Sequence, residues 1–113
     1  MDFEELIYKM DQKIFSLARS VRCSSSSVLD RDERIQWSSY VITAGDDIVD
    51  ALLCSTVDVT STLRMLRKKY EKASRLSKRI NPMISMSMFD VYVIVLDEIA
   101  SFMLEQEAVP YGN

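Results

Sequence analysis

The stretch SMFDVYVIVLDEIASFM, residues 87–103, decides between a helical and a mixed fold. Its centre, VYVIVL at 91–96, is rich in β-branched residues, and a short apolar run of this kind is also typical of a buried strand. The apolar positions nevertheless continue at helical spacing past Asp97 and Glu98 for two further turns. A single strand would also lack a partner elsewhere in the chain. The pattern therefore predicts a helix over 87–107.

Three earlier segments repeat apolar residues every three or four positions, which predicts helices over 3–22, 31–54 and 57–80. Each of the four helices is preceded by a pair that is typical of a capping box. The pairs are Asp2 with Glu5, Asp30 with Glu33, Ser55 with Asp58 and Ser87 with Asp90. Gly45 interrupts the second segment at a cost of about 1 kcal/mol relative to alanine. The stripe continues beyond it, so one long helix with room for a bend is expected rather than two short ones.

Four helices joined by short connections predict an all-α fold, an up-down-up-down four-helix bundle, in a single domain over 1–113. The composition, 48% hydrophobic and 27% charged, is that of one globular domain. Two Gly and two Pro are too few for the many turns of a sheet protein. We expect the Ser-rich segment 23–30 to be a linker and 108–113 to be a frayed tail.

The cysteine content indicates a reducing compartment. Cys23 and Cys54 lie far apart in a chain without His, which suggests neither a zinc site nor a disulfide framework. Free thiols favour a cytoplasmic or nuclear location. The first residues are acidic and amphipathic, unlike a signal peptide, and the longest apolar run is six residues, so no membrane span is expected.

The sequence has no histidine and no arrangement of residues that is typical of an active site. No pattern places a nucleophile beside a base, and the acid clusters of the second and fourth helices lack the Glu-x-x-His spacing of di-metal bundles. A domain of this size also leaves little room for a deep cavity. We therefore expect no enzyme activity, no metal, no cofactor and no small-molecule substrate.

The apolar arcs of three helices are wider than one contact requires. The residues beyond the main stripes are Val91, Val95 and Phe102 on the last helix, Trp37, Val41 and Ile48 on the second, and Tyr8 and Phe15 on the first. Such residues either pack at the centre of the bundle, with aromatic tips reaching water at its rim, or form an interface. The second alternative predicts a homodimer held by the fourth and second helices.

The segment 63–79 carries eight positive side chains and one negative, in a chain whose net charge is −3. Seven of them form a predicted basic stripe on the outer side of the third helix: Arg64, Arg67, Lys68, Lys72, Arg75, Lys78 and Arg79. Three alternatives remain open. The stripe is a solvated face that pairs with acids of the chain such as Asp46, Asp47 and Asp50, or it docks an acidic partner protein, or it binds phosphates of duplex RNA or DNA.

These features predict a small non-enzymatic protein-protein interaction module, an adaptor, assembly subunit or modulator that acts through helical faces and self-associates. The alternative is a nucleic-acid-binding protein that reads duplex shape through the basic stripe. The pI of about 4.9 argues against this alternative, because most nucleic-acid-binding domains are basic.

Overall fold

The computed structural model describes residues 3–24, 30–83 and 87–108. These residues form four helices and no strand: α1 (Phe3–Cys23), α2 (Arg31–Cys54), α3 (Val59–Ile80) and α4 (Met88–Ala108). The all-α class is confirmed, and 91–96 is helical as predicted. The predicted cap at Asp2, most of the predicted linker and the tail after Ala108 lie outside the described residues.

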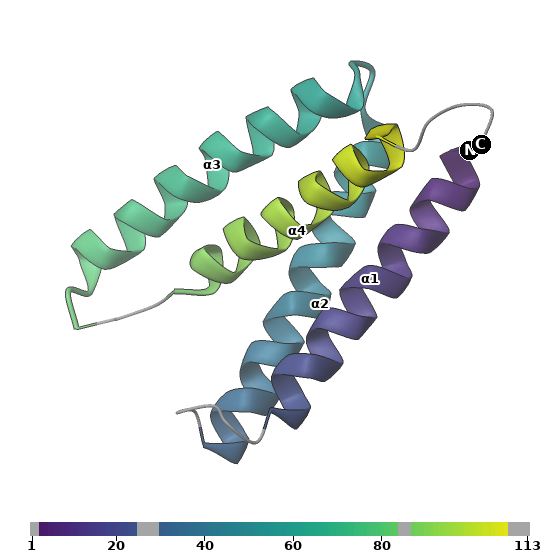
Figure 1. The fold of residues 1–113 in the computed structure, drawn as a ribbon. Coiled ribbons are helices and arrows are strands. Elements are labelled where there is room, and N and C mark those ends of the chain that lie inside the picture. The colour runs from purple at the N-terminus through teal and green to yellow at the C-terminus, as the bar shows by residue number, and fades with distance from the viewer. Residues whose placement is uncertain (1–2, 25–29, 84–86, 109–113) are drawn as a thin grey trace.

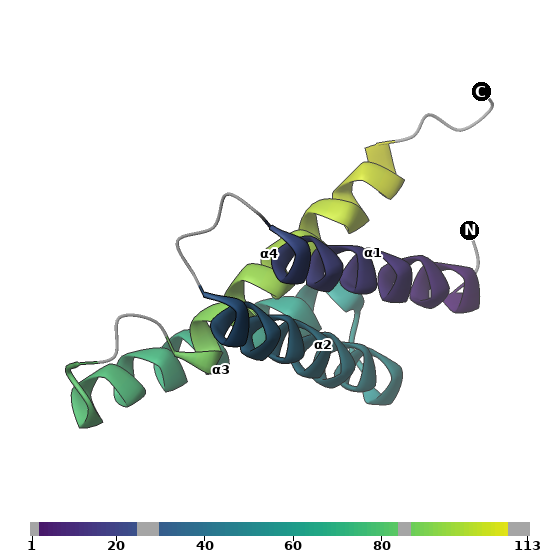
Figure 2. The same ribbon diagram turned by 90° about the horizontal axis from the view of Figure 1, so that it is seen from below.

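The four helices form two antiparallel hairpins that cross each other. Figure 1 shows α1 beside α2 and α3 beside α4, with consecutive helices running in opposite directions. The second view shows the α3–α4 hairpin lying obliquely over the first rather than aligned with it (Figure 2). The main contact between the hairpins joins α2 and α4, and in the described part of the chain α1 does not touch α3. The helices α2 and α4 are therefore central, and α1 and α3 are peripheral.

Two of the predicted capping pairs form hydrogen bonds, one of the two bonds of the box at α2 and both at α4. At α2, the Asp30 carboxylate accepts from the Glu33 backbone N–H at 2.8 Å. At α4, the Asp90 carboxylate accepts from the Ser87 N–H at 2.8 Å, while the Asp90 N–H lies 3.4 Å from the Ser87 hydroxyl oxygen, which accepts from it. These side chains satisfy backbone donors that have no partner within the helix, so they set the starts of both helices.

The start of α3 differs from the prediction by two residues. Asp58, not Ser55, is its N-cap, and the Asp58 carboxylate accepts from the Ser61 N–H at 2.7 Å. The Ser55 hydroxyl instead serves the turn after α2, where it accepts from the Val57 N–H at 3.1 Å. Because both Ser and Asp are favourable caps, the hydrogen bond within the turn decides which of the two begins the helix.

Gly45 lies where α1 and α2 approach each other. The helix α2 continues through it from Arg31 to Cys54, as predicted. A Cβ atom built on Gly45 would lie 2.5 Å from Cγ2 and 2.7 Å from Cδ1 of Ile14. These distances are shorter than van der Waals contact. The glycine therefore allows the backbone of α2 to pack directly against a core side chain of α1.

The core receives side chains from all four helices, and α2 and α4 contribute most of it; the buried apolar side chains of α4 are Val91, Tyr92, Val95, Leu96 and Ile99. The Tyr92 hydroxyl donates to the Asp47 carboxylate at 2.9 Å, which links α4 to α2. The Tyr92 ring meets the Tyr70 ring of α3 edge to face at a centroid distance of 4.8 Å. Burial, followed by the hydrogen bond to Asp47, raises the pKa of Tyr92 to about 12.

Candidate interaction surfaces

Four of the eight predicted interface residues belong to the core of the single chain. Val41, Ile48, Val91 and Val95 are between 0% and 3% exposed. The prediction that they form an intermolecular surface is wrong, because α2 and α4 are the central helices and are covered on more than one side. Their wide apolar arcs are a consequence of that position. A surface for a partner must lie elsewhere on the molecule.

The other four predicted interface residues lie at or near the surface. Trp37 and Phe102 are half-buried and pack against the core. Tyr8 and Phe15, both on α1, are each 62% exposed. Two large aromatic side chains that project from the same side of a peripheral helix form a candidate contact site for another molecule, since aromatic residues are enriched at protein interfaces.

Acidic residues flank these aromatic side chains. At 100° per residue, Glu4 and Asp11 lie on the same side of α1 as Tyr8 and Phe15, and each of the two pairs is seven residues apart. We call these four residues the acidic aromatic face. The pKa of Asp11 is raised, first by partial burial and then by the nearby carboxylate of Asp46. The face thus carries apolar and negatively charged groups side by side, with the exposed cation Arg19 one turn beyond Phe15.

The predicted basic stripe divides into two sets. Arg67 and Lys78 turn toward α4, where Arg67 pairs with Asp97 and Lys78 Nζ lies 3.2 Å from Asp90 Oδ2. Arg67 Nε also donates to Glu71 at 3.0 Å within α3. These ion pairs are half-exposed and join the two helices of the second hairpin. The intramolecular alternative therefore holds for two cations of the stripe, with acids of α4 rather than the predicted acids of α2 as their partners.

The paired charges have perturbed ionisation. Burial by itself would raise the pKa of Asp90, but hydrogen bonds from the Ser74 hydroxyl and the Ser87 N–H, together with Lys78, outweigh it and hold the pKa below its usual value. The hydrogen bond to Glu71, followed by the charge of Asp97, raises the pKa of Arg67. Both groups therefore remain charged near neutral pH, so the α3–α4 ion pairs persist there.

The second set consists of five cations on the outer side of α3. They lie within about 80° of one another on the helix and span about 22 Å along it. All five are exposed, and none forms an ion pair within the described part of the chain. We call this set the outer basic row: Arg64, Lys68, Lys72, Arg75 and Arg79. The hydrogen bonds from Ser61, followed by the charge of Arg64, lower the pKa of Asp58, so Arg64 has an acid nearby, while most of the positive charge of the row faces solvent.

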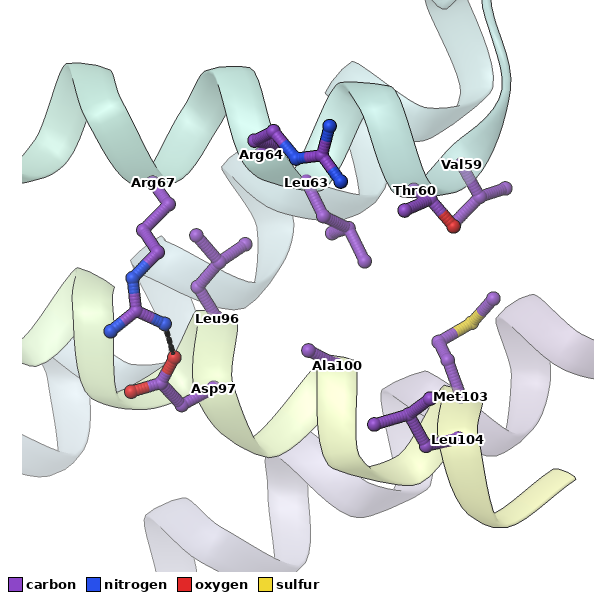
Figure 3. A pocket seen from close by; sticks show the side chains of 10 residues that line it. All are labelled: Val59, Thr60, Leu63, Arg64, Arg67, Leu96, Asp97, Ala100, Met103 and Leu104. Carbon is purple, nitrogen blue, oxygen red and sulfur yellow. Dashed lines mark hydrogen bonds and ion pairs between the residues drawn. The ribbon is translucent and has the colours of Figure 1, made fainter. Parts of the chain in front are cut away.

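An apolar groove of about 290 Å³ lies between the first half of α3 and the second half of α4. Figure 3 shows Leu63 of α3 and Ala100 of α4 facing each other across it. Arg64 and Arg67 stand on its α3 side, and Asp97 on its α4 side is paired with Arg67. The residues that line this α3/α4 groove are Val59, Thr60, Leu63, Arg64, Arg67, Leu96, Asp97, Ala100, Met103 and Leu104.

The groove was not predicted from the sequence. Leu104 is 65% exposed on its wall, although its side chain is large and apolar. Ala100 is small and leaves space between Leu96 and Leu104, one turn away on either side. This large-small-large alternation is the sequence feature that could have indicated the groove. It is not specific, because the same pattern occurs wherever two helices pack closely.

Comparison with protein-family models, curated proteins and solved structures finds no significant match to the chain. Among the residues that the structure describes, no three Cys, Asp or Glu side chains are grouped so as to hold a metal ion. Both Cys23 and Cys54 are exposed, free thiols. None of the helices, over the same residues, has the length and hydropathy to cross a bilayer.

Proposed function

We propose that this protein is a non-enzymatic interaction module that binds an acidic segment of a partner protein along the outer basic row of α3. The observation that supports it is the contrast within one helix. Arg67 and Lys78 are paired with acids of α4, whereas the five cations of the outer basic row face solvent and form no ion pair with any residue that the structure describes. Complementary charge on a partner gives specificity and fast association to such a surface.

The spacing of the row indicates the form of the partner. Its members follow one another at intervals of four, four, three and four residues, which is the repeat of a straight line along a helix. A second helix with Glu or Asp at the same intervals presents its carboxylates in a matching line. The α3 helix is peripheral and makes no contact with α1, so this side of it is open to such a helix.

Duplex RNA or DNA is the competing partner for the same row. The chain outside 63–79 carries six positive and sixteen negative residues, which repel a polyanion that extends beyond α3. Arg67 and Lys78 form ion pairs with acids of α4, which also reduces the number of cations available for phosphates. A short acidic helix needs only the length of α3. These features favour the protein partner.

Fluorescence anisotropy with two labelled probes tests the proposal. One probe is a helical 20-residue peptide with Glu at intervals of three and four, and the other is a duplex RNA of similar length. We expect salt-sensitive binding of the peptide by the wild-type chain. The triple variant Lys68→Glu, Lys72→Glu, Arg75→Glu is expected to bind at least tenfold more weakly, because three attractive contacts become repulsive.

A matched control keeps the net charge of that variant but leaves the row intact. Arg19, Arg22 and Arg31 are exposed cations of α1 and α2, and their replacement by Glu is expected to leave peptide binding within twofold of wild type. Equal losses in both triple variants would show that total charge, not the row, governs binding and would contradict the proposal. Tight binding of the duplex without binding of the peptide would replace the protein partner by nucleic acid.

A further inference from the structure

Two uncovered surfaces of this chain have complementary chemistry. The α3/α4 groove is apolar, with the guanidinium groups of Arg64 and Arg67 on one rim. The acidic aromatic face of α1 presents two exposed rings that alternate with two carboxylates along the helix. An apolar groove between two helices is a common receptor for one face of a third helix. The chain therefore carries both a receptor of this kind and a helix suited to it.

We propose that the acidic aromatic face of α1 docks into the α3/α4 groove of a second copy of this chain. Docking within one molecule is excluded, because α1 and α3 lie on opposite sides of the central helices and do not touch in the described residues. The inference goes beyond the proposed function, since the groove and the outer basic row share only Arg64. Each of the two interactions can exist without the other.

The dimensions of the two surfaces agree. Tyr8 and Phe15 are seven residues apart and therefore lie about 10 Å apart along α1. The α3 side of the groove runs from Val59 to Arg67, eight residues farther along the helix, which is about 12 Å. A volume of about 290 Å³ lies at the small end of ligand sites, so it suits one or two side chains rather than a larger molecule. One or both rings of α1 fit along this length.

The charges on the rim of the groove and on the acidic aromatic face are also complementary. Arg64 stands on the rim and forms no ion pair with any described residue, although its charge helps to lower the pKa of Asp58. It is therefore open to an ion pair with Glu4 or Asp11 of the second copy. Asp97 is the acid that lines the groove, and its pairing with Arg67 reduces its repulsion of those carboxylates. An aromatic ring in an apolar groove with arginine at its edge is the usual composition of an interaction hot spot.

The contact joins two different surfaces of the chain. Two copies close into an isologous pair if each inserts its α1 into the groove of the other, and they extend into a chain by heterologous contacts if only one does. In either case a variant that blocks the groove still offers an intact α1, and a variant that blocks α1 still offers an intact groove. This asymmetry provides a stringent test.

The test uses two exposed positions, one on each surface. Phe15→Glu places a charge in the acidic aromatic face, and Leu104→Glu places one on the wall of the groove. Both side chains are more than half exposed, so both variants are expected to melt within a few degrees of wild type by circular dichroism. Ser16→Glu, on an exposed position of α1 beside the face, is the matched control.

Light scattering over a concentration series gives the outcome. We expect wild type and Ser16→Glu to self-associate, each single variant to remain at 13.0 kDa, and an equimolar mixture of Phe15→Glu with Leu104→Glu to form a species of twice that mass, since one intact contact remains. A monomeric wild type, a single variant that self-associates like wild type, or a mixture that stays monomeric overturns the inference. The outer-row triple variant is expected to retain self-association, which separates a failure here from a failure of acidic-peptide binding.

Discussion

Replacing Gly45 by alanine tests the closest approach between α1 and α2. In a helix that faces solvent, the change stabilises by about 1 kcal/mol because alanine is the better helix former. Here the new methyl group would lie 2.5 Å from Cγ2 and 3.0 Å from Cγ1 of Ile14, atoms that are attached to its branched Cβ and move only with the backbone or a change of rotamer. Overpacking of this kind costs about 1 to 3 kcal/mol. We therefore expect Gly45→Ala to lower the free energy of unfolding by about 1 kcal/mol.

A double-mutant cycle isolates the steric part of this effect. Ile14→Ala removes every Ile14 atom within 3.0 Å of the new methyl and by itself costs about 2 to 5 kcal/mol, since Ile14 is buried. In that background Gly45→Ala meets no obstacle and is expected to stabilise by about 1 kcal/mol. The sign of the substitution thus reverses, with a coupling energy of about 2 kcal/mol between the two positions.

Urea unfolding of the four proteins at 25 °C, followed by circular dichroism, measures these values. Equal slopes with denaturant concentration show that the midpoints report stability alone. If Gly45→Ala stabilises the wild type as much as it stabilises the Ile14→Ala variant, the two helices are farther apart than the structure has them, and the steric argument fails.

Two further substitutions test the polar contacts of the fold. The pKa of Tyr92 is raised to about 12, so its contribution to stability is complete below the unfolded value of about 10 and is lost as the pH rises toward 12. Over that interval urea unfolding is expected to show wild type losing about 2 to 3 kcal/mol more than Tyr92→Phe, and parallel pH profiles would contradict the assignment. Asp58→Ala removes the N-cap of α3 and is expected to cost about 1 kcal/mol, against less than about 0.5 kcal/mol for the exposed neighbour Thr56→Ala, both measured by thermal unfolding. Equal effects of these two changes would place the cap elsewhere.

The positions of the helices could be predicted from the sequence, because apolar periodicity and capping residues are local properties. The start of α2 at Arg31 agrees with its prediction, and that of α4 at Met88 differs from it by one residue. At α3, Ser55 and Asp58 were both acceptable caps by residue type. Only the hydrogen bond of the Asp58 carboxylate to the Ser61 N–H distinguishes them, and this bond depends on the path of the connection.

The interaction surfaces could be predicted less well, because they depend on how the helices are placed against one another. Periodicity places Val95 on a second apolar side of its helix, yet it cannot tell whether a neighbour in the same chain or another molecule covers that side. The division of the basic stripe depends on the rotation of α3 relative to α4, which turns Arg67 toward Asp97 and leaves Lys68 in solvent. The α3/α4 groove arises from the same placement.

The pairing of consecutive helices into hairpins also bears on how the chain folds. Most residue contacts of the described chain are local in sequence because they lie within helices, and helical proteins dominated by local contacts fold in microseconds to milliseconds. During synthesis the α1–α2 hairpin is complete before α4 emerges from the ribosome. Until then the side of α2 that packs against α4 is uncovered, so the first hairpin alone exposes apolar surface that the last helix later buries.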